Sequence, residues 1–151
     1  MFTAHPYFMP PEHHFDNRGT RPMKVSELMQ TDVRTAAPDW TLSEVVQSLT
    51  DGHVTALPVV DRHGRILGVV STADVLEAQA DPDGGEAWRD ALVSDVMNRP
   101  ALTIAADADI RAAAQQMLYG EVHRLFVEES GRLVGVISQT DLIRALARRN
   151  L

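Results

Sequence analysis

The sequence predicts an α/β fold of two tandem units packed about a pseudo-twofold axis, each ordered helix, strand, helix, strand, strand, helix. An internal repeat is the main observation behind this prediction. The segment VSELM at residues 25–29 returns as VSDVM at residues 93–97. The segment GVVS at residues 68–71 returns as GVIS at residues 135–138. The clefts between two such copies are the natural places for ligand sites.

Composition excludes several classes of protein. The chain has 151 residues, 44% of them hydrophobic, which suits one compact domain made of two halves. It has no cysteine, so disulfides, thiolate chemistry and cysteine-based zinc sites are excluded. There is neither a run of about 18 apolar residues nor the residue order of a signal peptide, and we expect a cytoplasmic protein that does not enter membranes.

The balance of charge argues against one class of partner. The formal net charge is -7, and we expect no nucleic-acid partner, because such binding rests on neutralising phosphates. An anionic ligand would need a local cluster of arginines, because the net charge of the whole chain is negative.

Residues that interrupt helices and strands mark the domain boundaries. Residues 1–22 carry prolines without hydrophobic periodicity, and we expect a flexible N-terminal tail. Its histidines at positions 5, 13 and 14 can bind a metal, but we prefer a tail without one, and we predict no metal site. The repeats are expected at residues 23–80 and 92–149, with a linker at residues 81–91 that contains the sequence DPDGG.

The first repeat opens with helical signals. A short helix capped by Ser26 is expected to end near Met29, followed by an extended segment over residues 32–37. Thr41 and Glu44 have the spacing of a capping box, and apolar residues then recur at i, i+3, i+4 and i+7. Asp51-Gly52 ends that helix.

A β-hairpin and a last helix complete the first repeat. Residues 56–60 and 65–70 are expected to be paired strands joined by a turn at residues 61–64. Their nearly continuous apolar run indicates a sheet covered on both faces. Ser71 or Thr72 is expected to cap a helix that runs to Ala78.

The second repeat has the same order of elements. Its predicted elements are a short helix capped by Ser94, an extended segment over residues 101–104, a helix capped by Asp109, strands over residues 125–127 and 133–137 that turn at Ser130-Gly131, and a final helix from Ser138.

Four segments together resemble a known family. They are VTALPVVD at residues 54–61, GVVSTAD at residues 68–74, VHRLFV at residues 122–127 and GVISQTD at residues 135–141. They resemble the cystathionine-β-synthase (CBS) domain, and the pair looks like a Bateman module over residues 23–149. The second copy is similar to the nucleotide-sensing gamma subunit of AMP-activated kinase. The resemblance implies a non-catalytic regulatory module that binds AMP, ADP or ATP, with S-adenosylmethionine or NADH as further candidates.

The main cleft is expected at Asp141. Its carboxylate can accept both ribose hydroxyls, Ser138 and Thr140 supply hydroxyls beside it, and the helix that starts there offers amide donors to an anion. Arg124 can grip a phosphate with two hydrogen bonds. Ser138 and Asp141 also have the spacing of a plain helix cap. Arg124 favours the ligand, since its counterpart is Ala56 and the fold does not require a cation there.

The resemblance places the base near the first repeat, with backbone groups of Val54 and of Val136 or Ile137 reading its edge. The full expected site is Val33, Thr35, Val54, Thr55, Ala56, His123, Arg124, Val136, Ile137, Ser138, Thr140 and Asp141.

A second cleft is expected around Asp74, and it is the weaker site because Ala56 and Ala73 stand where Arg124 and Thr140 stand in the main one. We expect it to be empty or to hold a less charged ligand. Its expected residues are Val70, Ser71, Thr72, Asp74, Thr103, Val122 and His123.

The function expected is therefore regulatory, with signalling by conformational or assembly change to an unknown target protein in trans. A homodimer is expected, through apolar faces left over on the helices at residues 42–49 and 110–118. The alternative is a ligand-free CBS-pair scaffold that serves dimerisation. The chain contains no GxSxG, P-loop, GxGxxG or HExxH motif, so we expect no enzyme. The sequence does not choose among the adenosyl ligands.

Overall fold

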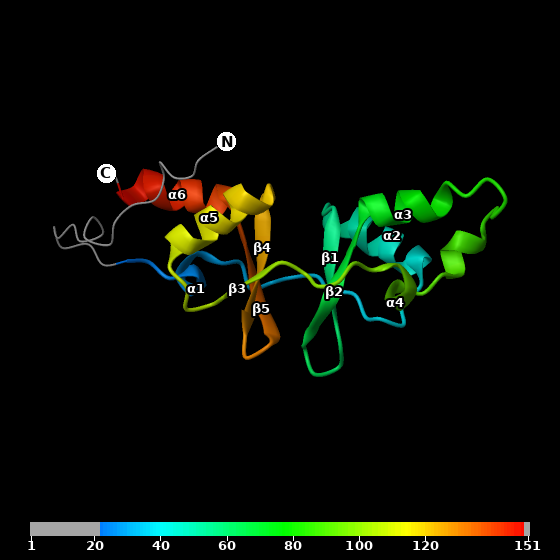
Figure 1. The fold of residues 1–151 in the computed structure, drawn as a ribbon, viewed down its shortest axis with the longest axis horizontal. Helices are drawn as coiled ribbons and strands as arrows, with labels where there is room; N and C mark the ends of the chain where they lie inside the picture. Colours follow the sequence, from blue (N-terminus) through cyan, green and yellow to red (C-terminus); the bar gives the residue numbers. More distant parts are fainter. Residues whose placement is uncertain (1–21, 150–151) are drawn as a thin grey trace.

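The structure, a computed structural model, describes residues 22–149 and consists of two lobes that lie side by side (Figure 1). A β-hairpin of each lobe faces the centre, and helices cover the lobes farther out. The expected N-terminal tail lies outside the described residues except for Pro22, and so do His5, His13 and His14.

The first repeat contains the expected helices and hairpin. Its elements are α1 (Val25–Leu28), α2 (Leu42–Gly52), β1 (Ala56–Val60), β2 (Ile66–Ser71) and α3 (Thr72–Gln79), and β1 pairs antiparallel with β2. The second repeat follows a short 3-10 helix, η3 (Ala87–Asp90). Its elements are α4 (Val93–Val96), β3 (Thr103–Ala105), α5 (Ile110–Gly120), β4 (Arg124–Glu129), β5 (Arg132–Ser138) and α6 (Gln139–Arg149). The predicted order of mixed helices and strands in two tandem units is confirmed.

The short strand is complete only in the second repeat, where β3 runs parallel to β4 in a sheet of order β3-β4-β5. In the first repeat it shrinks to a single bridge between Ala36 and Val59. The reason lies in β1: Pro58 has no N–H to donate. Its counterpart Phe126 donates its N–H to the carbonyl of Leu102 at 3.3 Å.

The first helix of each repeat packs on the other lobe. Val25 of α1 is fully buried in a core cluster whose other members come from the second repeat. Val93 of α4 is fully buried among residues of the first repeat. The chain thus crosses between the lobes twice, and each hydrophobic core is completed by the opposite repeat.

Backbone hydrogen bonds fix these exchanged segments to the hairpins. Gln30 and Val136 exchange N–H to carbonyl bonds of 2.8 and 2.9 Å, and Asn98 and Val69 exchange bonds of 2.9 and 3.0 Å. The approach is close because the neighbouring position in each strand is a glycine. A Cβ on Gly135 would lie 2.7 Å from the carbonyl oxygen of Gln30.

The capping predictions are confirmed for the long helices. The Thr41 hydroxyl accepts from the Glu44 N–H at 3.3 Å, and the Glu44 carboxylate accepts from the Thr41 N–H at 2.8 Å. Ser71 caps α3 and Asp109 caps α5 in the same side-chain-to-amide manner.

The predicted caps of the two short helices are wrong: Ser26 and Ser94 lie inside α1 and α4, whose N-caps are Lys24 and Leu92. The reason is tertiary. The Ser26 N–H donates to the carbonyl of Ala106 at 2.9 Å, and the Ser94 N–H donates to that of Pro38 at 2.9 Å. The opposite repeat therefore satisfies amides that a side-chain cap would serve.

The hairpin turn after β1 forms as predicted, with the Gly64 N–H donating to the Asp61 carbonyl at 3.0 Å. The Asp61 carboxylate accepts from the N–H groups of Arg65 (3.0 Å) and His63 (2.8 Å). These bonds, chiefly that from Arg65, hold the pKa of Asp61 below its usual value.

Most of the apolar stripe of α2 is buried in the hydrophobic core. Leu42, Val45 and Leu49 are buried in the cluster of the first lobe, whereas Val46 is half-buried and lines a shallow apolar pocket with Leu76 of α3, which is 64% exposed. Part of the apolar face of α2 is therefore left over, and its use by a dimer partner stays a prediction. On α5, Ala113 and Met117 are likewise buried, whereas Leu118 is 69% exposed. The apolar face of α5 that stays exposed is therefore the one that carries Leu118.

Replacing Gly135 by alanine tests the close approach of the exchanged segment. We expect Gly135→Ala to lower the free energy of unfolding by about 1–3 kcal/mol, because the new methyl group must push the backbone of Gln30 away. Gly120→Ala is the matched control, since a Cβ there meets only ordinary contacts, the nearest at 3.6 Å. Urea unfolding of the two variants and the wild type measures the difference, and equal stability of Gly135→Ala and wild type would contradict it.

Candidate functional site

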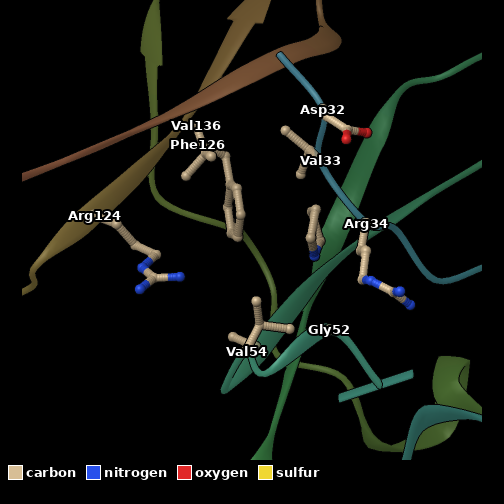
Figure 2. Close-up of a pocket in the computed structure, with 10 residues that line it drawn as sticks. Asp32, Val33, Arg34, Gly52, Val54, Arg124, Phe126 and Val136 are labelled. Carbon is tan, nitrogen blue, oxygen red and sulfur yellow. The ribbon is translucent and has the colours of Figure 1, made fainter. Parts of the chain in front are cut away.

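A cavity of about 360 Å³ opens between the two repeats. Both repeats contribute to it, as do the residues that lead from α1 into the first lobe (Figure 2). Its lining residues are Asp32, Val33, Arg34, Gly52, Val54, Ala56, Pro58, Arg124, Phe126 and Val136.

One part of the wall is apolar. Figure 2 shows the ring of Phe126 and the side chains of Val33 and Val54 turned toward the same space, with Val136 behind the ring. Phe126 is 7% exposed and belongs to neither core cluster, so its ring is buried at the wall between the two repeats. A wall of this kind suits a flat apolar group such as an aromatic base.

Two arginines flank the cavity. Arg124 is the first residue of β4 and stands opposite Ser138 in the hairpin. Arg34 lies on the other side of the cavity, where its side chain passes Gly52 and its guanidinium is directed away from Arg124 (Figure 2). Within residues 22–149, neither guanidinium forms an ion pair with a carboxylate. The cavity therefore presents two unneutralised cations and one carboxylate, that of Asp32, in a chain with a net charge of -7.

Arg34 was not predicted from the sequence, although a signal for it exists. At the offset that relates Thr35 to Thr103, the counterpart of Arg34 is Leu102. At this position only one repeat has a cation, and the same holds at the position where Arg124 corresponds to Ala56. Applying that comparison to every position would have identified both arginines.

Five expected site residues line the cavity, namely Val33, Val54, Ala56, Arg124 and Val136. The backbone N–H and carbonyl of Val136 already bond to Gln30, and the side chain of Ile137 is fully buried in the core. Six other expected residues are not among the lining residues: Thr35, Thr55, His123, Ser138, Thr140 and Asp141.

Asp141 forms a helix cap, which is one of the two roles that the sequence allows for it. It is 6% exposed. One carboxylate oxygen accepts from the N–H and the hydroxyl of Ser138, at 2.9 and 3.0 Å. The other accepts from the side-chain amide of Gln30 at 3.1 Å and lies 3.7 Å from Arg144. Its acceptor capacity is thus in use within the protein.

The expectation of free amide donors at the start of α6 needs a correction. The N–H of Gln139 donates to the carbonyl of His123 at 2.9 Å, and the N–H of Asp141 donates to the Ser138 hydroxyl at 3.2 Å. These two donors are satisfied internally, so cations rather than this helix start carry the positive charge of the cavity.

The expected second cleft repeats the polar arrangement without the cations. Asp74 is 8% exposed and accepts from the N–H and hydroxyl of Ser71 at 2.7 and 3.0 Å and from the side-chain amide of Asn98 at 2.9 Å. Val70 is fully buried. Thr72 and His123 are exposed, and Thr103 and Val122 are partly buried.

Residues 22–149 contain neither a metal-binding cluster of side chains nor a membrane-spanning helix. No group of three or more His, Cys, Asp or Glu side chains is arranged to hold a metal ion there. Across the same residues, no helix has both the length and the apolar character needed to cross a membrane.

Comparison with solved structures supports the fold. CBSX2 in complex with AMP matches with a TM-score of 0.73 at 23% identity, over 85% of this chain and 98% of the other. The CBS domain pair of protein MJ0100, in complex with 5′-methylthioadenosine and S-adenosylmethionine, matches with a TM-score of 0.70 at 21% identity, over 85% and 99%. At these identities the likeness concerns the fold.

Curated relatives include longer proteins. An inosine-5′-monophosphate dehydrogenase of Methanocaldococcus jannaschii is 29% identical over 80% of this chain, but the chain spans only 23% of that enzyme. Two further archaeal relatives are spanned to 63% and 40% of their length. The similarity to the dehydrogenase therefore carries no catalytic activity over to this chain.

A family model described as the CBS domain matches residues 25–81 and again residues 93–148. The two matches correspond to the two repeats and together cover more than half of the chain. The chain therefore belongs to the CBS-domain family, as a tandem pair of CBS domains.

Proposed function

We propose that the protein is a non-catalytic regulatory module that binds an adenine nucleotide or related adenosyl ligand in the cavity between its CBS domains. One observation carries the proposal: an apolar wall and two arginines that form no ion pair within residues 22–149 share one cavity in an otherwise acidic chain. Relatives of the same fold that hold AMP or S-adenosylmethionine support an adenosyl ligand.

The base would lie against Phe126, Val33 and Val54, which exclude water from its faces. Arg124 would hold a phosphate through two parallel N–H···O bonds, the geometry that a guanidinium offers best. The other expected residues, Thr35, Thr55, His123, Ser138 and Thr140, would serve the ribose and the rim of the site.

Asp141 would accept the ribose diol only by giving up the bond from Gln30. This exchange replaces one amide donor by up to two hydroxyl donors, so the carboxylate loses no hydrogen bond overall. Gln30 belongs to the segment that leads from α1 back to the first lobe, and its release would loosen one of the crossings between the lobes. A ligand shifts such an equilibrium by its differential affinity for the two states, which would then signal to a target protein in trans.

The second cleft around Asp74 would be empty or hold a less charged ligand, since Ala56 stands where a phosphate would need a guanidinium.

A homodimer is part of the proposal as well. Apolar side chains on α5 and α6 are largely exposed: Leu118 (69%), Tyr119 (77%), Ile143 (63%) and Leu146 (54%). A group of this kind on contacting helices favours burial against a second copy.

Calorimetric titration with AMP, ATP, S-adenosylmethionine and NADH tests the binding. We expect at least one ligand to bind and Arg124→Gln to weaken the binding of a phosphate-bearing ligand about 10- to 100-fold, the equivalent of a lost charge-assisted hydrogen bond. Arg132→Gln is the matched control, because Arg132 lies on the same hairpin at its turn end. No heat with any ligand, in folded protein free of carried-over nucleotide, would favour the ligand-free scaffold instead.

Sedimentation velocity tests the dimer. We expect the wild type to sediment as a dimer and Leu146→Glu to sediment as a monomer, because a charge buried in an apolar interface lacks a partner. The exposed position of Leu146 leaves the fold intact, which circular dichroism checks. A wild type that sediments as a monomer at all concentrations would contradict the proposal.

A further inference from the structure

We infer that the ligand of this cleft is a polyanion, an adenosyl compound with two or more phosphate groups, which Arg34 and Arg124 hold from opposite repeats. The inference rests on the proposed function and specifies the class of ligand. Both guanidiniums line one cavity, and Figure 2 shows them on opposite sides of it.

The position of Arg34 depends on a glycine. Its side chain lies across Gly52, the last residue of α2, and its Nη1 donates to the hydroxyl of Ser48 at 3.4 Å. A Cβ on Gly52 would lie 2.5 Å from both Cδ and Nε of Arg34. The side chain of Arg34 therefore rests against this glycine, and an alanine there would displace the end of the arginine.

Gly52 has its counterpart in Gly120, which ends α5 with Leu102 rather than an arginine beside it. The left-handed residue that ends α2 is His53, with φ of 53°, and not Gly52. The space that Gly52 provides is used by Arg34. The C-terminal end of α2 also favours a cation, because the last carbonyls of a helix carry partial negative charge.

Charge argues for more than one phosphate. Two like charges at one cavity repel each other, and Asp32 is the single carboxylate among the lining residues. The single phosphate of a nucleoside monophosphate would have to reach guanidiniums that lie on opposite sides of the cavity. A chain of phosphates offers a second group to the second arginine, whereas the sulfonium and ammonium of S-adenosylmethionine would be repelled.

The two arginines also distinguish this cleft from its pseudo-symmetric counterpart. At the equivalent positions of the other repeat, Arg34 and Arg124 are replaced by Leu102 and Ala56. The fold is therefore built without these cations in one of its two halves, and packing does not account for them. Two cations at one cavity favour a highly charged anionic ligand.

Calorimetric titrations without divalent cations test the inference, with ATP, AMP, S-adenosylmethionine and inorganic tripolyphosphate as the probes. We expect ATP to bind at least about 10-fold more tightly than AMP, and S-adenosylmethionine to bind most weakly. Arg34→Gln should reduce the affinity for ATP about 10-fold and leave that for AMP nearly unchanged. Gly52→Ala should reproduce the effect of Arg34→Gln by displacing the side chain, and Arg132→Gln should bind like the wild type.

The outcomes separate this inference from the proposed function. Equal affinities for AMP and ATP that Arg34→Gln does not change would overturn the inference and leave nucleotide binding in place. Tightest binding of S-adenosylmethionine would overturn it too. Binding of tripolyphosphate alone, lost in Arg34→Gln, would support the polyanion site and contradict an adenosyl ligand. No binding of any probe to protein with an unchanged circular dichroism spectrum would overturn both.

Discussion

The reciprocal burial of two short helices is the constraint on which the rest of the structure depends. Val25 completes the core of the second lobe and Val93 completes that of the first, so neither repeat closes its core alone. Gly68 and Gly135 admit the exchanged backbones to within hydrogen-bonding distance of the hairpins. These bonds join the two lobes, and Val33 and Arg34 of the crossing segment line the cavity between them.

The crossing segment brings structural and functional groups together. Gln30 bonds to Val136 through its backbone and to Asp141 through its side chain, and Asn98 has the same double role toward Val69 and Asp74. The carboxylates expected to bind ribose are thus the ones that hold the crossings in place. In our proposal this shared use couples occupancy of the cavity to the arrangement of the lobes, since a ligand competes with the crossing for the same acceptor.

Much of this architecture could be predicted from the sequence. The repeat is visible as similar segments in the two halves of the chain. The hairpins and the capping boxes depend on neighbours within a few residues. These predictions are confirmed. The exchange of α1 and α4 could not be predicted, because an apolar Val25 indicates burial without saying in which core. The caps at Ser26 and Ser94 failed for the same reason. The loss of a strand before Ala36 traces to Pro58, which has no N–H to donate. Arg34 was predictable in principle, by its contrast with Leu102.

A crystal structure of the protein with ATP tests the central claim most directly. The account predicts the nucleotide in the cavity between the hairpins, with its base against Phe126 and its phosphates between Arg34 and Arg124. Electron density for the nucleotide in the cleft around Asp74, or with its phosphates directed away from both arginines, would contradict it.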